Sequence, residues 1–246
     1  QRDLGEVDAK KNEFLAMLSQ ELRNPLAAMQ NAAQLLGEES DEPTRHWATG
    51  IVRRQVGQLS RLVEDLVDVS RITHGRIELR RDHLDIRPIL RRAIETARPL
   101  IEERRHTIRV VASEETLLVS ADSARLEQLL VNLITNAAKY TDPDGLIEVT
   151  AARDGGDVVV TVKDNGIGIE PGLLPEIFGL FVQDTRGLGR ARGGLGIRLA
   201  LGRRLAEMHD GTVTGTSDGP GRGSAFTVRL PMLALHMSNT AFLKAR

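Results

Sequence analysis

The first part of the chain is dominated by apolar residues spaced three and four apart, in two runs separated by a break. The runs cover residues 15–36 and 52–69, and their spacing predicts two long amphipathic helices. Gly37 ends the first helix, and residues 38–43 are expected to form the connecting turn. The helices should fold back as an antiparallel hairpin. Pairing with a second copy into a dimeric four-helix bundle would cover the apolar faces that one hairpin leaves exposed.

The pattern changes after Arg76, where short β-type runs alternate with helices. We therefore expect a multidomain chain, with a helical hairpin over 1–76, an α+β sandwich over 77–232 and a tail without clear pattern over 233–246. We expect a single sheet, with helices covering one of its faces. Asp85 and Asp122 are the expected helix caps. Helices are predicted from Asp85 to about residue 104, over 123–140 and over 198–208. Strands are predicted over 107–111, 146–151, 158–162 and 226–230, with a hairpin turn at 154–157.

Composition excludes several classes of protein. The 33 Lys and Arg nearly balance the 34 Asp and Glu, so no overall basic field favours nucleic acid or an anionic membrane as a partner. The absence of cysteine excludes disulfides and thiolate metal sites. No apolar run approaches the ~20 residues that span a bilayer. We expect a cytoplasmic fragment without membrane contact, and any sensor or membrane region would lie outside it.

A polar face on the helix expected after Asp122 suggests a binding site. Asn132, Asn136 and Lys139 share that face, with Tyr140 beside them. Mg²⁺ prefers oxygen ligands and keeps waters and substrate phosphates, so the carbonyl oxygen of an Asn is a suitable single protein ligand. A solvated polar face is the alternative interpretation of these residues taken alone.

Two glycine-rich segments follow. In Asp164 to Ile169, a carboxylate precedes Gly166 and Gly168; it could accept a hydrogen bond from an exocyclic amine such as that of adenine, while the glycines allow close backbone approach. Gly193 to Ile197 opens the last expected helix, where free N–H groups favour phosphate oxygens. Taken singly, the first segment is also compatible with a surface turn and the second with a linker.

These motifs, in this order, resemble the Bergerat-type (GHKL) ATP-binding domain of sensor histidine kinases. Residues 132–140 resemble the N box, 164–168 the first glycine box, 178–181 the F box and 194–196 the second glycine box. The segment from Phe14 to Leu26 is similar to the phosphoacceptor motif of the same family. An ordinary coiled-coil hairpin is the alternative that periodicity alone leaves open for that segment.

The resemblance implies a role for each matching position. Asn136 would coordinate Mg²⁺, and Asn132 and Lys139 would address the phosphates of ATP. Asp164 would hold the adenine amine. Glu21 would act as general base, and Asn24 would position a water for dephosphorylation of a response-regulator receiver domain. The remaining cofactor-binding positions that the resemblance implies are Tyr140, Gly166, Gly168, Phe178, Gly194, Leu195, Gly196 and Ser224.

Gln20 departs from the family, because it stands where the phosphoacceptor histidine is expected. A neutral imidazole offers a localised nitrogen lone pair, whereas the amide nitrogen of Gln is delocalised into its carbonyl. We therefore predict that Gln20 accepts no phosphoryl group, while binding of ATP and homodimer formation persist. Such a substitution is compatible with an engineered trap and with a natural pseudokinase. Arg198, where the family commonly has a further glycine, could either crowd the phosphates or add a cation.

One other function stays open: an ATP-gated pseudokinase scaffold or a response-regulator phosphatase that uses Asn24. A third interpretation is a hydrolase of the gyrase or chaperone branch, which resembles this chain in its nucleotide fold. Those enzymes place a Glu four residues before the Mg²⁺-binding Asn, whereas this chain has Asn132 there, which argues against a hydrolase. The six histidines of the chain could be proposed as substitute acceptors, but none lies in a matching motif, and they are expected to be surface or packing residues.

Overall fold

The computed structural model describes residues 2–37, 41–73, 78–180, 182 and 196–233. The chain divides into two compact units. One comprises Gln1–Glu78, Ile169–Arg204 and Ser217–Pro220, and the other comprises Leu79–Gly168, Leu205–Thr216 and Gly221–Arg246. The domain limits proposed from the sequence at residues 76 and 232 stay a prediction.

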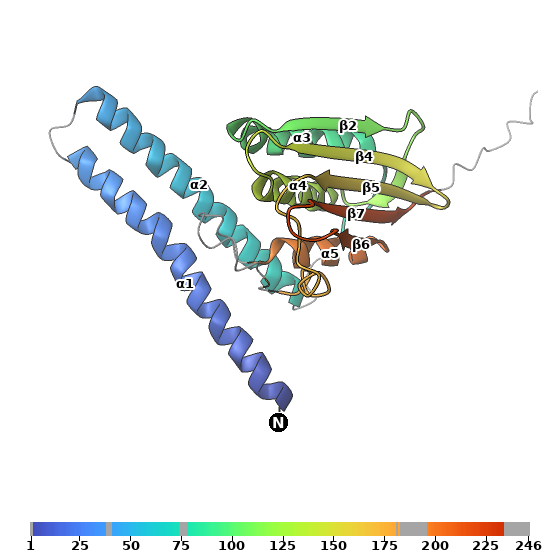
Figure 1. The fold of residues 1–246 in the computed structure, drawn as a ribbon, viewed down its shortest axis with the longest axis horizontal. Helices are drawn as coiled ribbons and strands as arrows, with labels where there is room; N and C mark the ends of the chain where they lie inside the picture. Colours follow the sequence, from blue (N-terminus) through green and yellow to red (C-terminus); the bar gives the residue numbers. More distant parts are fainter. Residues whose placement is uncertain (1, 38–40, 74–77, 181, 183–195, 234–246) are drawn as a thin grey trace, which may run out of the picture. The chain divides into compact units, whose positions relative to one another are not determined.

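The first unit contains the predicted helical hairpin. Helices α1 (Arg2–Gly37) and α2 (Glu42–Thr73) run antiparallel (Figure 1). The start of α2 differs slightly from expectation, because the helix begins within the predicted turn. Asp41 caps it by accepting a hydrogen bond from the backbone N–H of Thr44, 3.0 Å away. Pro43 then lies in the first turn, where its missing N–H needs no partner.

The hairpin buries only part of its apolar surface. Ala32 and Ala48 are fully buried, and Leu62 packs in a cluster with Ile197 and three partly buried leucines, Leu18, Leu59 and Leu66. Other apolar side chains of the two helices are exposed, as expected for a hairpin that lacks a second layer. These exposed residues, which we call the apolar stripe, are Leu26, Leu36, Trp47, Val56, Val63 and Val67.

The second unit is built on a five-stranded sheet in the order β2-β4-β5-β7-β6. Strand β2 pairs with β4 in parallel, and the other pairs are antiparallel. Helices α3 and α4 lie on one face of this sheet (Figure 1). Strands β1 and β3 form a separate antiparallel pair. The bounds are β1 Asp82–Asp85, α3 Ile86–Glu103, β2 Thr107–Ala112, β3 Leu118–Ala121, α4 Ser123–Tyr140, β4 Leu146–Asp154, β5 Asp157–Asp164, α5 Arg198–Met208, β6 Thr212–Thr216 and β7 Ser224–Pro231.

Local sequence explains most of these elements. Alternate residues of β5, namely Val158, Val160 and Val162, are buried, as a half-buried strand requires. Asp85 and Asp122 cap α3 and α4 by accepting hydrogen bonds from backbone N–H groups of the first turn, as predicted. The sequence interpretation missed β1, β3 and β6. These strands are only four or five residues long, and their sequences give little periodicity to recognise.

Candidate functional site

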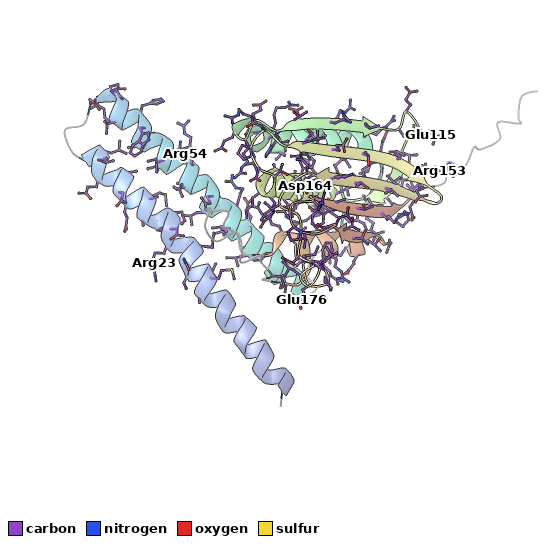
Figure 2. All side chains as sticks on the ribbon, in the orientation of Figure 1. Arg23, Arg54, Glu115, Arg153, Asp164 and Glu176 are labelled. Atoms are coloured by element: carbon purple, nitrogen blue, oxygen red, sulfur yellow. The ribbon has the colours of Figure 1, made fainter. Side chains whose placement is uncertain are left out.

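The candidate site is centred on Asp164, the last residue of β5. Its strand partner is Ser224, the first residue of β7, so the two side chains meet at the same end of the sheet. Ser224 Oγ donates to Asp164 Oδ2 at 2.5 Å. The backbone N–H of Gly166 donates to Oδ1 at 2.8 Å. Figure 2 shows Asp164 at the opposite end of the sheet from Arg153, which lies by the β4–β5 turn.

The carboxyl group of Asp164 is deeply buried, with the residue 4% exposed. Burial raises its pKa above the ordinary aspartate value, and the hydrogen bonds from Ser224 and Gly166 act in the opposite direction. The two carboxylate oxygens offer about four acceptor positions, and the hydroxyl of Ser224 and the backbone N–H groups of Gly166 and Ser224 occupy three of them. Asp164 can therefore still accept a hydrogen bond from a ligand that carries an N–H donor.

Backbone contacts bring three segments together around Asp164. Tyr140, at the end of α4, accepts a hydrogen bond through its carbonyl oxygen from the N–H of Ile167, 3.0 Å away. The N–H of Gly223 donates to Gly166 O at 3.1 Å. A Cβ atom on Gly166 would collide with the carbonyl oxygen of Tyr140, and one on Gly223 would collide with that of Asp164. Glycine is therefore required at both positions for this close backbone approach.

The polar residues predicted on α4 lie where the sequence places them. Asn132 and Asn136 are one turn apart and only 7% and 9% exposed. The side-chain Nδ2 of Asn132 has no hydrogen-bond partner among the described residues. Lys139 Nζ lies 5.0 Å from the ring centroid of Tyr140. A buried amide donor without a partner is costly, so its position suits a ligand with oxygen acceptors.

The other predicted cofactor-binding residues are divided between the two compact units and a segment outside the described residues. Phe178 belongs to the first compact unit, where the guanidinium carbon of Arg203 lies 6.0 Å from its ring centroid. Gly196 belongs to the same unit and has a φ of 65°. Gly194 and Leu195 lie outside the described residues. Gly168 is in the second unit and is buried, with a φ of 67°.

The acceptor segment lies on α1 within the hairpin. Gln20 and Asn24 are exposed, and Glu21 is half-buried. Because Gln20 and Asn24 are four residues apart on a continuous helix, they share one face. Arg23, labelled in Figure 2, lies in the same turn and is also exposed. The segment is therefore accessible in the hairpin.

Sequence interpretation missed two residues that shape the Asp164 end of the site. Gly223 has a φ of 71°, which compounds the steric need for glycine there. Asn165 accepts a hydrogen bond through Oδ1 from the backbone N–H of Leu146, 2.8 Å away, and so fixes the loop to β4. The glycine density just before Ser224, at positions 219, 221 and 223, could have indicated the first of these.

Two sequence families match separate parts of this chain. Residues 121–234 match the family described as "Histidine kinase-, DNA gyrase B-, and HSP90-like ATPase". Residues 10–75 match the "His Kinase A (phospho-acceptor) domain". The chain has the core of a sensor histidine kinase. This family membership confirms the expected combination of a helical N-terminal region with an α/β sandwich of the GHKL type.

Curated sensor proteins resemble this histidine kinase core along most of its length. Sensor protein DivL of Caulobacter vibrioides is 34% identical over 231 residues, which cover 93% of this chain and 29% of DivL. Sensor histidine kinase TrcS of Mycobacterium tuberculosis is 33% identical over 242 residues, covering 95% and 46%. The chain thus spans less than half the length of either relative.

Solved structures show the same architecture. The full-length ShkA structure in complex with AMPPNP has a TM-score of 0.66 and 32% identity, covering 90% of this chain and 46% of ShkA. Histidine kinase AdeS of Acinetobacter baumannii has a TM-score of 0.65 at 23% identity, covering 87% and 98%, which shows likeness of fold alone. No helix in the described part of the chain combines the length and the apolar character that a membrane span needs.

Proposed function

We propose that this histidine kinase core binds Mg·ATP, with Asp164 as the contact for the adenine amine. The observation that carries the proposal is the buried Asp164 carboxylate, held by Ser224 and Gly166 yet still able to accept a donor. Because there is no room for a Cβ atom at Gly166, only backbone atoms lie next to the carboxylate at this position. A flat ring carrying an exocyclic amine fits that combination.

Residues of α4 would bind the other end of the nucleotide. Asn136 would supply a carbonyl oxygen to Mg²⁺, because this cation accepts few protein ligands and retains phosphate oxygens and waters. The Nδ2 group of Asn132 and the ammonium group of Lys139 would donate to phosphate oxygens. Tyr140 would flank the nucleotide. Phe178, Gly194, Leu195 and Gly196 would complete the site, as their counterparts do in the family that the chain resembles.

Titration calorimetry tests this proposal directly. Wild-type protein should release heat on binding a non-hydrolysable ATP analogue with Mg²⁺, and chelation of the metal should weaken that binding. A guanine nucleotide should bind more weakly, since it presents a carbonyl where adenine presents an amine. No binding of the adenine nucleotide in the presence of Mg²⁺ would rule the proposal out.

We further propose that the chain is deficient in autophosphorylation. In the family reaction, a histidine nitrogen attacks the γ-phosphorus of ATP and the phosphoryl group then passes to a response-regulator aspartate. Gln20 occupies the exposed acceptor position on α1 and has no nucleophilic nitrogen. Labelled ATP should therefore leave no phosphohistidine on the protein.

The expected partners are a second copy of the chain and a response-regulator receiver domain. The apolar stripe supports the first, since a hairpin that leaves these side chains in water gains by pairing into a four-helix bundle. Membership of the histidine kinase family supports the second. Sedimentation of the purified protein would distinguish a dimer from a monomer.

A second candidate function is a response-regulator phosphatase, or more generally an ATP-gated pseudokinase scaffold. The observation that favours it is the exposed amide of Asn24, one turn beyond Gln20 on the same face of α1. Such an amide can orient a water for attack on an aspartyl phosphate without any histidine. Addition of this chain should then accelerate loss of phosphate from a phosphorylated regulator, and Asn24→Ala should abolish the acceleration.

A further inference from the structure

His209 follows the last residue of α5 and is one of the most buried polar residues of the second unit, at 2% exposed. Both ring nitrogens have partners. Nδ1 lies 2.7 Å from the carbonyl oxygen of Leu205, and Nε2 lies 3.0 Å from the backbone nitrogen of Asp122. A backbone N–H can only donate, so Nε2 must be the unprotonated acceptor and Nδ1 must carry the proton. The ring is therefore neutral and fixed in one tautomer.

The partners of His209 belong to two different helix ends. Asp122 is the N-cap of α4, and its carboxylate accepts hydrogen bonds from the N–H groups of Ala124 and Arg125. Leu205 lies in the last turn of α5, where carbonyl groups lack partners within the helix. His209 thus accepts from the N-cap residue of α4 and donates to a residue in the last turn of α5. This single imidazole joins the two helices directly.

Helix α4 carries residues of the proposed nucleotide site, and helix α5 directly follows a segment assigned to it. Helix α4 contains Asn132 and Asn136, ten and fourteen residues after its cap. Helix α5 begins two residues after Gly196. A change in the tilt or the start of either helix would therefore displace groups proposed to contact the phosphates or Mg²⁺.

Several charged groups surround the imidazole. Arg81, which precedes β1, forms an ion pair with Asp210 at 2.5 Å and also donates to the carbonyl oxygen of Met208. Burial is the largest cause that lowers the pKa of His209, and Arg81 lowers it further, while the hydrogen bond to Leu205 and the charges of Asp122 and Asp210 act to raise it. If Nε2 gained a proton, it would present a donor to the donor N–H of Asp122.

We propose that neutral His209 is a positioning residue for nucleotide binding, coupling the start of α4 to the end of α5. This role rests on the proposed nucleotide site and goes beyond it, because His209 itself contacts no ligand. The coupling depends on an acceptor at the position of Nε2. Protonation of the ring removes that acceptor, so acid weakens nucleotide binding through a group outside the site.

Two substitutions separate this role from simple packing. His209→Phe keeps an aromatic ring of similar size but offers no acceptor to Asp122. His209→Gln can still place an amide oxygen near the N–H of Asp122 and does not titrate. Val158→Ala serves as the stability control, because Val158 is fully buried at the end of β5 remote from Asp164, where its strand partner is Leu230.

The measurement is the affinity for an ATP analogue with Mg²⁺, by calorimetry, from about pH 7.5 to about pH 5.5, with the midpoint of thermal unfolding of each variant. We expect His209→Phe to lose about tenfold in affinity at neutral pH, because the start of α4 is no longer held in place when the N–H of Asp122 loses its acceptor. His209→Gln should retain most of the affinity and lose part of the wild-type decline in acid. Val158→Ala should lower the midpoint of unfolding and keep the wild-type affinity.

The outcomes distinguish this role from the proposed function. If the wild-type protein binds nucleotide and His209→Phe binds equally well, the role of His209 is wrong and the proposed function stands. The same conclusion follows if His209→Gln shows the full wild-type pH dependence, a result that needs no folded His209→Phe protein. If the wild-type protein binds no nucleotide, the proposed function is wrong and this role with it.

Discussion

The hydroxyl group of Ser224 donates to the carboxylate of Asp164 across the β5–β7 pair, with 2.5 Å between Oγ and Oδ2. Burial disfavours the ionised form of Asp164 and raises its pKa, whereas this hydrogen bond stabilises the ionised form. The hydroxyl and the N–H of Gly166 together fix the orientation of both carboxylate oxygens. The proposed adenine contact is thus oriented before any ligand arrives.

Asp164→Asn should weaken nucleotide binding without destabilising the empty protein. A raised pKa means that the folded state binds the proton more tightly than the unfolded state, so the contribution of Asp164 to stability falls as pH rises from the ordinary 3.8 through the folded-state pKa. Asn removes that cost and still has an oxygen for Gly166 N–H. Thermal unfolding should show a midpoint at neutral pH equal to or above that of wild type, and calorimetry should show an affinity at least about tenfold lower.

Asp154→Asn is the matched control for that prediction. Asp154 is exposed and pairs with Arg229 at 2.5 Å, an interaction worth about 0–1 kcal/mol at a surface. Its substitution should not change nucleotide affinity appreciably. Equal losses of affinity in the two variants would show that Asp164 has no specific part in binding.

Ser224→Ala should move the acid limb of nucleotide binding to higher pH. Loss of the hydroxyl removes a hydrogen bond that lowers the pKa of Asp164, so the carboxylate would protonate more readily and a higher pH would be needed to ionise it. The loss should cost about 1–3 kcal/mol of binding free energy at neutral pH. Ser224→Thr retains the hydroxyl and should stay close to wild type; an unchanged pH profile in Ser224→Ala would contradict the expectation.

Gly223→Ala should destabilise the second unit. Its φ of 71° is unfavourable for a residue with a side chain, and the new Cβ would collide with the carbonyl oxygen of Asp164. Strain of this kind costs about 1–3 kcal/mol, measurable by urea unfolding. Gly156→Ala is the control, since Gly156 has no positive φ and no atom within 4 Å of an added Cβ.

Gln20→His should restore autophosphorylation if the remaining catalytic groups are intact. The imidazole would supply the nucleophilic nitrogen that Gln20 lacks, at an exposed position on α1. Incubation with labelled ATP should yield an acid-labile phosphate, and Gln20→Ala should yield none. Adding Glu21→Gln to the restored protein should slow the reaction by roughly 10²–10⁴-fold if Glu21 is the general base. Labelling of the unmodified protein on histidine would overturn the predicted deficiency.

Val63→Asp should weaken self-association of the hairpin. Val63 is 52% exposed and belongs to the apolar stripe, and a charge there would have to be buried in a four-helix bundle. Sedimentation should show a shift from dimer towards monomer at micromolar concentration. Trp47, the single tryptophan of the chain and also part of the stripe, gives a fluorescence signal for the same change; identical sedimentation of variant and wild type would place the interface elsewhere.

Most of the fold followed from the sequence because its signals are local. The caps at Asp85 and Asp122 and the turn at 154–157 act within a few residues, so α3, α4 and the β4–β5 hairpin could be predicted. Strand β6, with Gly215 among threonines, has no clear apolar alternation, and its place at the sheet edge depends on pairing with β7. The position of β6 therefore depends on tertiary contacts and not on local strand propensity.

The residues of the candidate site could be predicted from the sequence, but the contacts between them could not. The N box and first glycine box were recognised from their own residues, and Ser224 from a resemblance. The need for glycine at 223 depends on the carbonyl of Asp164, which lies far away in sequence. His209 was expected to be a surface or packing residue; it is buried, but its hydrogen bond to Asp122 spans 87 positions and leaves no local signal.

The pairing of Asp164 with Ser224 also constrains the order of folding. The two residues are 60 positions apart, and β7 is the last strand to be added to the sheet along the chain. Contacts of such long separation form late, because the intervening loop must first be closed. A nascent chain that has not yet released β7 has Asp164 without the hydroxyl group of Ser224 that orients its carboxylate. Acquisition of ligand affinity would therefore report completion of the sheet, and the nucleotide could stabilise only molecules that have already finished folding.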